Sequence, residues 1–282
     1  MRVARTSVRG PSGKGESLPS LADFGWFDEG RGTPILFLHS SGASRRQWAR
    51  LREPWRDRWR ALGLDLWGYG DTPMPPRPAA FRLGREVELA RSLLNRVDEP
   101  FHIVGHSYGG AVGLRLALDF PDQVLSVSVH EPVLFHLLRD AKCAEEWAEI
   151  SRITGEVLRL INQQDLSGGA ETFVDYWNGE GTWRGLTAGQ QERTAMSARK
   201  APLDFAALFA ESDPLTRFGG LAGKALVTVG ERTRAPAAKV AALLGSVLGP
   251  GSLRIVPGAG HMAPITAPEE IRPLIEERMG MG

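Results

Sequence analysis

A serine in the stretch Gly105-His106-Ser107-Tyr108-Gly109 is the side chain of this sequence best placed to act as a nucleophile. The stretch fits the pattern G-x-S-x-G. An apolar run at residues 101–104 predicts a buried strand before it, and residues 111–118 predict a mostly apolar, buried helix after it. A strand, a tight turn and a helix in this order hold a serine on a strained bend at the strand end. Because a hydroxyl is a weak nucleophile at neutral pH, Ser107 needs a base nearby, and the base needs an orienting partner.

The elements that would position such groups alternate between strands and helices. Buried strands are predicted at residues 35–38, 60–66, 101–104, 124–129, 225–229 and 253–256. Helices separate most of these runs, which favours a mostly parallel, doubly wound α/β sheet. In such sheets active groups gather at the carboxyl ends of the strands. Ser41, Ser107 and Glu131 all follow such ends.

Gly105-His106-Ser107-Tyr108-Gly109-Gly110 resembles the nucleophile elbow of the α/β-hydrolase superfamily. Three further stretches resemble that family in its own order and spacing. They are Leu36-Phe37-Leu38-His39-Ser40-Ser41-Gly42, Asp65-Leu66-Trp67-Gly68-Tyr69-Gly70-Asp71-Thr72 and Pro257-Gly258-Ala259-Gly260-His261-Met262. The resemblance covers most of the chain and implies an α/β-hydrolase fold with an inserted helical cap. We therefore expect an N-terminal extension at 1–20, a core at 21–133 and 217–282, and a cap at 134–216.

The resemblance implies that His261 is the base, because the family keeps its catalytic histidine on a loop after the last strand. The acid departs from the commonest family arrangement. The aspartate expected three residues after Gly230 is replaced by Thr233, which cannot carry a negative charge. Glu131 ends the preceding strand on the same rim, and one subgroup of haloalkane dehalogenases and fungal lactonases for macrocyclic lactones resemble this arrangement. We expect Ser107, His261 and Glu131 to act together, with Glu231 as the alternative acid.

The resemblance also implies an oxyanion hole, a pair of backbone N–H groups that bind a negatively charged oxygen. Its donors would be Tyr108, which follows the nucleophile, and Ser41, with Ser40 as the alternative to Ser41. The cap is predicted to be helical and rich in aromatic residues. Ligand sites are lined mostly by such side chains, although any single one is more often part of the cap core. The expected substrate-binding residues are Ser40, Phe135, Trp147, Trp177, Trp183 and Met262.

The charge and composition of the chain argue against some classes of binding partner. A formal charge of +1 argues against a nucleic-acid or strongly electrostatic membrane partner, and no apolar run reaches the length of a membrane span. The single cysteine, Cys143, excludes an internal disulfide and fits a reducing compartment. We expect a cytoplasmic protein with a small-molecule substrate. The oligomeric state is open, with a homodimer as one option.

The function expected from these residues is cleavage of a carboxylic ester or lactone of an apolar small molecule through an acyl-enzyme. No metal-ligand spacing or phosphate-binding glycine loop occurs, so neither a metal nor a cofactor is expected. Dehalogenases and epoxide hydrolases of this fold use an aspartate nucleophile, which excludes them here. Carbon–carbon bond hydrolysis, a cofactor-free lyase reaction, or ligand binding on a hydrolase scaffold remain alternatives, because site details rather than fold set function.

Overall fold

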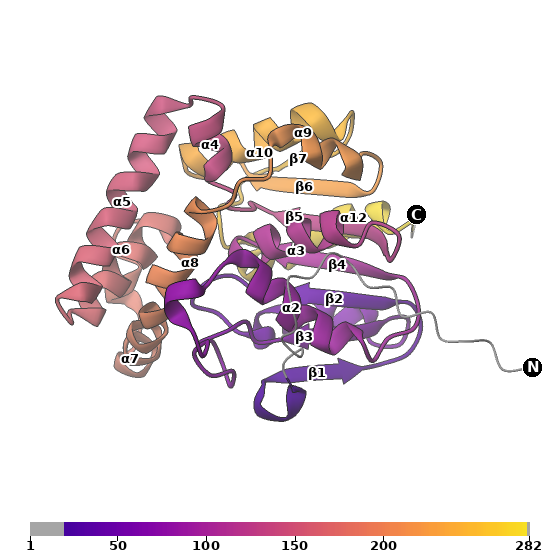
Figure 1. Cartoon of the computed structure of the whole chain (residues 1–282), viewed down its shortest axis with the longest axis horizontal. Coiled ribbons are helices and arrows are strands. Elements are labelled where there is room, and N and C mark those ends of the chain that lie inside the picture. Colours follow the sequence, from indigo (N-terminus) through magenta and orange to yellow (C-terminus); the bar gives the residue numbers. More distant parts are fainter. Residues whose placement is uncertain (1–19, 281–282) are drawn as a thin grey trace, which may run out of the picture.

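The computed structural model describes residues 20–280. Within them, seven strands form one sheet in the order β1-β3-β2-β4-β5-β6-β7 (Figure 1). The strands are β1 Trp26–Glu29, β2 Pro34–Leu38, β3 Arg60–Leu64, β4 Phe101–His106, β5 Val124–His130, β6 Ala225–Gly230 and β7 Leu253–Val256. Only β1 runs antiparallel to its neighbour, β3; every other pair is parallel. The predicted α/β-hydrolase sheet is confirmed.

The strand order reverses at β2. The chain moves from β2 to β3 on one side, and then crosses back to place β4 on the other side of β2. Such a switch point leaves a crevice beyond the carboxyl ends of the two diverging strands, which is where ligands bind in open α/β sheets. Ser41 follows β2 and Ser107 follows β4, so both lie at this crevice.

Helices cover both faces of the sheet, as its buried central strands require. Those outside the predicted cap are α1 Ala49–Arg52, α2 Leu83–Leu94, α3 Tyr108–Asp119, α9 Leu215–Phe218, α10 Ala235–Leu248, α11 Ala263–Thr266 and α12 Pro268–Arg278. Residues 45–55 form the short α1 between two 3-10 turns, Arg45–Trp48 and Glu53–Trp55. Pro54 lies in the second turn and has no N–H to continue an α-helix.

Helices α5 Ala144–Asn162, α6 Leu166–Asn178, α7 Ala188–Ser197 and α8 Ala201–Phe209 lie together beyond the carboxyl ends of the parallel strands (Figure 1). We call them the cap helices. The short helix α4 His136–Asp140 leads into them, and the 3-10 turn Ala198–Lys200 joins α7 to α8. No helix within residues 20–280 has the length and apolar character needed to cross a membrane.

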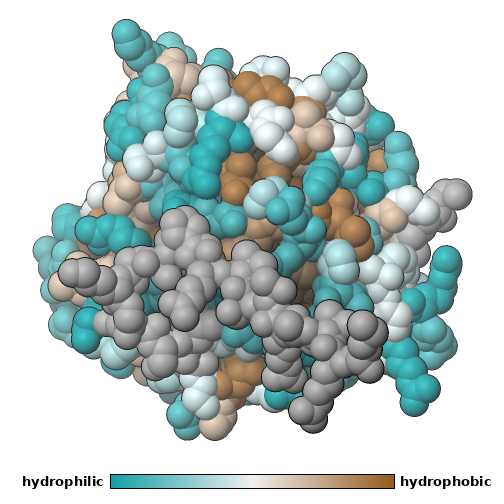
Figure 2. All heavy atoms as spheres, turned by 45° about the vertical axis from the view of Figure 1, so that its right-hand side comes forward, coloured by the Kyte–Doolittle hydropathy of each residue, from teal (hydrophilic) through white to brown (hydrophobic). Residues whose placement is uncertain are grey.

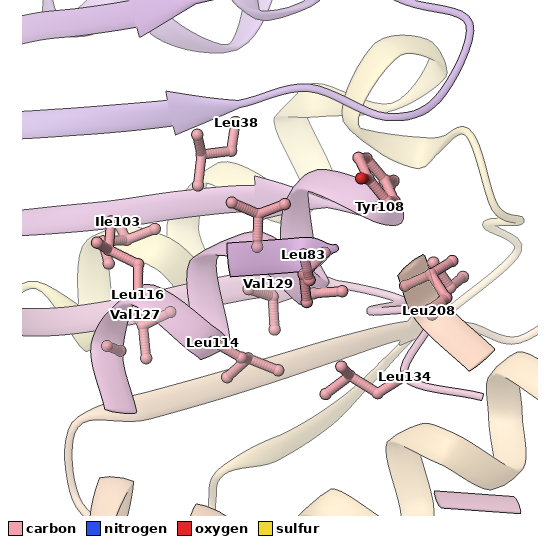
Figure 3. Close-up of a cluster of buried hydrophobic side chains, with 14 of the residues drawn as sticks. Leu38, Leu83, Ile103, Tyr108, Leu114, Leu116, Val127, Val129, Leu134 and Leu208 are labelled. Atoms are coloured by element: carbon pink, nitrogen blue, oxygen red, sulfur yellow. The ribbon is translucent and has the colours of Figure 1, made fainter. Parts of the chain in front are cut away.

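The main hydrophobic core is continuous from the sheet into the cap helices. Leu114 and Leu116 of α3 lie with Ile103, Val127 and Val129 of the strands, and Leu208 of α8 belongs to the same cluster (Figure 3). All of these side chains are at most 2% exposed. The same buried hydrophobic contacts therefore stabilise both the sheet and the packing of the cap helices against it.

The surface away from the cap helices shows no large hydrophobic area in the part drawn in colour in Figure 2. Where it is drawn in colour, the face that comes forward in Figure 2 is mostly hydrophilic, and its hydrophobic residues form separate small areas. Isolated apolar residues are normal on a protein surface and need no partner to explain them.

Candidate active site

Ser107 stands on a strained turn between β4 and α3. Its backbone has φ 53° and ψ −116°, a conformation that L-residues rarely adopt, and its N–H donates to the carbonyl of His130 at 2.9 Å. Gly109 permits the turn, because a Cβ there would collide with the carbonyl oxygens of Leu38 and His39. The turn therefore presents the hydroxyl at the end of the strand and leaves the first N–H groups of α3 facing the same space.

Ser107, His261 and Glu131 form a continuous hydrogen-bonded chain. The ring of His261 has its Nε2 3.0 Å from the Oγ of Ser107 and its Nδ1 2.7 Å from the Oε2 of Glu131. Because a carboxylate only accepts, Nδ1 carries the proton and Nε2 is left to accept from the serine. The exposed fractions are 5%, 5% and 0%, respectively, so the chain is largely shielded from water. The arrangement can remove a proton from the hydroxyl and stabilise the resulting imidazolium.

Glu131 is held in place by neighbours from β6. Its Oε1 accepts from the N–H of Gly230 at 2.9 Å, and its Oε2 accepts from the hydroxyl of Thr233 at 2.6 Å. Burial alone would raise the pKa of the Glu131 carboxyl. The hydrogen bond from His261 and the charge that its ring carries when protonated, with smaller effects of His130 and Thr233, outweigh burial and lower this pKa from 4.5 to about 2. Glu131 is therefore a carboxylate at any pH near neutrality.

The backbone of His261 is tied to the loop after β2. Its carbonyl accepts from the Nε2 of His106 at 2.7 Å, and the Nδ1 of His106 lies 3.1 Å from the amide nitrogen of Gln47. The amide oxygen of Gln47 accepts from both the N–H and the hydroxyl of Ser40, at 3.1 and 2.9 Å. Burial lowers the pKa of His106 well below its usual value, so its ring is neutral. His106 therefore holds the site loops in place instead of supplying a base.

The same hydrogen bonds distinguish the two candidates for the second oxyanion donor. The N–H of Ser40 is committed to Gln47. Within residues 20–280, neither the N–H of Ser41 nor that of Tyr108 donates to any group. Unpaired N–H groups beside a nucleophile can bind an oxyanion, so the geometry favours Ser41 and Tyr108 over Ser40 for that role.

A narrow pocket with a cavity volume of about 20 Å³ lies beside Ser107. Besides Ser107 and Ser41, its lining consists of Val133, Phe135, Phe173, Trp177, Ala201, Asp204, Phe205 and Leu208. Most of these side chains are apolar, and most come from the cap helices. Trp177 also stacks on the ring of His261, with ring centroids 4.1 Å apart and planes at 27°. Two of the six expected substrate-binding residues, Phe135 and Trp177, line this pocket.

The other four expected substrate-binding residues lie elsewhere. Trp147 packs on Phe209, with ring centroids 5.0 Å apart, and Trp183 belongs to a small cluster inside the cap. Ser40 is bound to Gln47, and Met262, next to His261, is absent from the lining. Packing within the cap uses Trp147 and Trp183 for its own core, which their residue type alone does not reveal.

Six lining residues were not predicted from the sequence and had little to identify them: Val133, Phe173, Ala201, Asp204, Phe205 and Leu208. Asp204 and Phe205 lie on α8, in a stretch recognised only as a helix of the cap. A carboxylate in a helix usually faces solvent, and Asp204 does not: it is 2% exposed. The only available signal was the position of α8 immediately before the return to the core.

The family model described as "Alpha/beta hydrolase family" matches residues 35–274. The chain belongs to this family. It is an alpha/beta hydrolase whose nucleophile elbow carries a serine.

Two curated relatives match a part of this alpha/beta hydrolase. A fluoroacetate dehalogenase from Burkholderia sp is 36% identical over 104 residues, which cover 36% of this chain and 34% of the relative. The dihydrolipoyllysine-residue acetyltransferase component of an acetoin cleaving system from Cupriavidus necator is 35% identical over 102 residues, 36% of this chain and 27% of the relative. The matches thus span about a quarter and a third of the two relatives, and they do not assign the activity of either to this chain.

Solved structures match nearly the whole chain at low identity. A structure described as an N-acyl homoserine lactone degrading enzyme has a TM-score of 0.69 and 19% identity, covering 90% of this chain and 96% of the other. A structure from work on the carboxylesterases of Nitrososphaera gargenis has a TM-score of 0.73 and 17% identity, covering 94% and 97%. Likeness at this identity shows the fold alone.

The alternative acid, Glu231, makes no hydrogen bond to His261 within residues 20–280 of this alpha/beta hydrolase. It is exposed, and its carboxylate accepts from the N–H of Gly258 at 2.8 Å. Thr233, which occupies the commonest acid position, instead donates its hydroxyl to Glu131. The geometry therefore favours Glu131 as the partner of His261.

Proposed function

We propose that this protein is a serine hydrolase that cleaves carboxylic esters or lactones of small apolar molecules through an acyl-enzyme. The observation that carries the proposal is the chain from Ser107 through His261 to Glu131, at 3.0 and 2.7 Å, beside an apolar pocket. Two unpaired N–H groups, of Ser41 and Tyr108, complete the set of groups that acyl transfer needs.

The reaction follows from these groups. Ser107 Oγ attacks the carbonyl carbon while His261 Nε2 takes the hydroxyl proton, and Glu131 stabilises the imidazolium. The negative oxygen of the tetrahedral intermediate is bound by the N–H groups of Ser41 and Tyr108. Its collapse releases the alcohol, which receives the proton from His261, and leaves the acyl group on Ser107. Water, deprotonated by His261, then attacks the acyl-enzyme, and the acid is released with Ser107 reprotonated.

The pocket favours a short apolar acyl group. Its cavity volume is only about 20 Å³, and aromatic rings close it on several sides. Carboxylesterases and a lactone-degrading enzyme are among the proteins of similar fold, which supports the choice of ester and lactone substrates. A single cysteine fits a reducing compartment. We therefore propose that the reaction takes place in the cytoplasm.

A fluorophosphonate probe, which phosphonylates activated serines, tests the nucleophile. We expect the folded protein to be labelled at Ser107 and the Ser107→Ala variant to remain unlabelled. A folded wild-type protein without label at Ser107 would favour a ligand-binding protein on a hydrolase scaffold.

A panel of p-nitrophenyl esters of graded chain length, with several lactones and with fluoroacetate, tests the reaction class. We expect turnover of short esters or lactones and no release of fluoride, because dehalogenases of this fold use an aspartate nucleophile. Labelling of Ser107 without ester or lactone turnover would point to carbon–carbon bond hydrolysis or to a lyase. Fluoride release would contradict the proposal.

A further inference from the structure

A buried lysine lies between two buried carboxylates next to the site. The Nζ of Lys200 is 2.5 Å from the Oδ1 of Asp204 and 3.1 Å from the Oε1 of Glu86. Lys200 and Glu86 are 0% exposed and Asp204 is 2% exposed. The ammonium also lies over the rings of Phe81, at 4.2 Å, and of Tyr108, at 5.2 Å. None of these charges has a role in the proton transfers proposed above.

Each of the two carboxylates holds one residue of the proposed oxyanion hole. The Oδ2 of Asp204 accepts from the hydroxyl of Ser41 at 2.6 Å. The Oε1 of Glu86 accepts from the hydroxyl of Tyr108 at 3.2 Å. Lys200 therefore connects Ser41 and Tyr108 through one carboxylate each.

Two further bonds attach the cluster to the neighbouring loops. The hydroxyl of Tyr69, in the loop after β3, donates to the same Asp204 oxygen at 2.5 Å. The Oε2 of Glu86 accepts from the N–H of Trp67 at 3.1 Å. The cluster therefore contacts three segments: the loop after β2 through Ser41, the loop after β3 through Tyr69 and Trp67, and the start of α3 through Tyr108.

A gain in stability is a weak explanation for this cluster. Removing three charged groups from water is unfavourable, and replacing a buried ion pair with apolar residues is often neutral or stabilising. Burial is also the largest influence on the Glu86 carboxyl, and it raises the pKa of Glu86 even with Lys200 beside it. The two carboxylates around one ammonium are therefore better explained by a need to hold the residues that they bind, Ser41 and Tyr108, in fixed positions.

We propose that Lys200, Asp204 and Glu86 are positioning residues that fix the backbone N–H groups of Ser41 and Tyr108 as an oxyanion hole. This proposal rests on the proposed function, because it assigns the cluster to the binding of the oxyanion in that reaction. Asp204 lies on α8 and Lys200 on the turn before it, whereas Glu86 lies on α2 and Ser41 and Tyr108 lie at the sheet. Because the cluster joins α8 to α2, the proposal requires these two helices to stay packed together for both N–H groups to be held in place.

The test compares Lys200→Met and Glu86→Gln with wild type, using p-nitrophenyl butyrate and active sites counted by fluorophosphonate labelling. Neither residue lines the pocket, so their effects must pass through the residues they hold. We expect kcat per labelled site to fall about 10- to 100-fold while KM changes less than about threefold, because an oxyanion hole acts in the transition state. The affinity for a trifluoromethyl ketone, which forms a tetrahedral adduct, should fall by the same factor as kcat.

Glu211→Gln is the matched control. Glu211 is 7% exposed and pairs with Arg115 of α3 at 2.9 Å, so this variant also removes a buried carboxylate from a contact between α3 and the segment after α8. We expect its melting temperature to fall and its kcat to stay within about twofold of wild type, because the pair does not hold Ser41 or Tyr108.

The remaining outcomes separate a failure of the positioning role from a failure of the proposed hydrolase function. Unchanged kcat in Lys200→Met and Glu86→Gln, or an equal loss of kcat in Glu211→Gln, would overturn the positioning role and leave the hydrolase in place. Wild-type protein without ester turnover and without a labelled Ser107 would overturn the proposed function, and this inference with it. If Lys200→Met does not fold, Glu86→Gln and Tyr108→Phe decide, and the latter should lower kcat by about three- to tenfold because it removes one hydrogen bond.

Discussion

Glu131 is a fully buried carboxylate that accepts hydrogen bonds from His261, Thr233 and the backbone of Gly230. Its backbone φ of 45° is itself uncommon for a residue other than glycine, and it turns the chain at the end of β5. At the scale of the residue, this glutamate sets the tautomer of His261 and thereby leaves Nε2 free to accept the serine proton.

Glu131→Gln should lower kcat by about 10³- to 10⁴-fold, because an amide cannot support an imidazolium and allows the wrong tautomer. Steady-state ester hydrolysis measures the effect. Glu231→Gln is the control and should stay within about threefold of wild type, since Glu231 binds only the backbone of Gly258. The reverse pattern, with the loss in Glu231→Gln, would assign the acid to Glu231.

The pKa of Glu131 also predicts how stability depends on pH. The folded-state pKa of about 2 lies below the usual 4.5, so the stabilisation is complete above pH 4.5 and is lost as pH falls towards 2. It amounts to about 3 kcal/mol at neutral pH, of which about 2 kcal/mol should be lost by pH 3. Urea unfolding of wild type and Glu131→Gln from pH 6 to pH 3 isolates this contribution. Parallel stability curves for the two proteins would contradict it.

At the scale of the element, the carboxylate that contacts His261 follows β5, whereas the commonest family arrangement has it after β6. The two strands are parallel neighbours, with His130 paired to Thr228 in register, so their carboxyl ends lie side by side. The hydroxyl of Thr233 is 2.6 Å from the carboxylate oxygen that contacts His261. Either strand end can therefore bring a carboxylate to the imidazole.

Thr233→Asp in the Glu131→Gln background should restore at least about tenfold of the lost kcat, because it returns a carboxylate to the neighbourhood of Nδ1. The same substitution in the wild-type background is the control. There it should lower kcat, since two carboxylates would share one imidazole and repel each other. If the double variant is no faster than Glu131→Gln, then the end of β6 cannot supply the acid in this protein.

At the scale of the whole molecule, the reacting groups come from the sheet and most of the pocket wall comes from the cap helices. The main hydrophobic core includes strand residues and also Trp177 and Leu208 of the pocket wall. The shape of the cap helices should therefore decide which acyl groups fit.

Phe205→Ala should shift the preferred ester to a longer acyl chain, because it removes a ring from the pocket wall. The ratio of kcat/KM for p-nitrophenyl octanoate to that for the butyrate measures this shift, and we expect it to rise about tenfold or more. Trp183→Phe changes an aromatic side chain inside the cap and should leave the ratio unchanged. An unchanged ratio in Phe205→Ala would place the acyl group elsewhere.

Local patterns predicted most of the sheet, and the resemblance to the family added the expectation that His261 lies beside Ser107 and Glu131, which the structure brings into contact. Apolar runs and their alternation with helices define the parallel sheet, and the order of strands places Ser107, Glu131 and His261 on one rim. The pocket wall could not be predicted in this way. Which side of a cap helix faces the site depends on packing between helices, which put Trp147 and Trp183 inside the cap and Asp204 in the site.

The central claim is that Ser107 forms an acyl-enzyme, and acid quenching during turnover of p-nitrophenyl butyrate tests it most directly. Mass spectrometry of the digested protein should find one butyryl group, on the peptide that carries Ser107, and none in Ser107→Ala. Turnover without an adduct on that peptide, or with an adduct on another residue, would contradict the account.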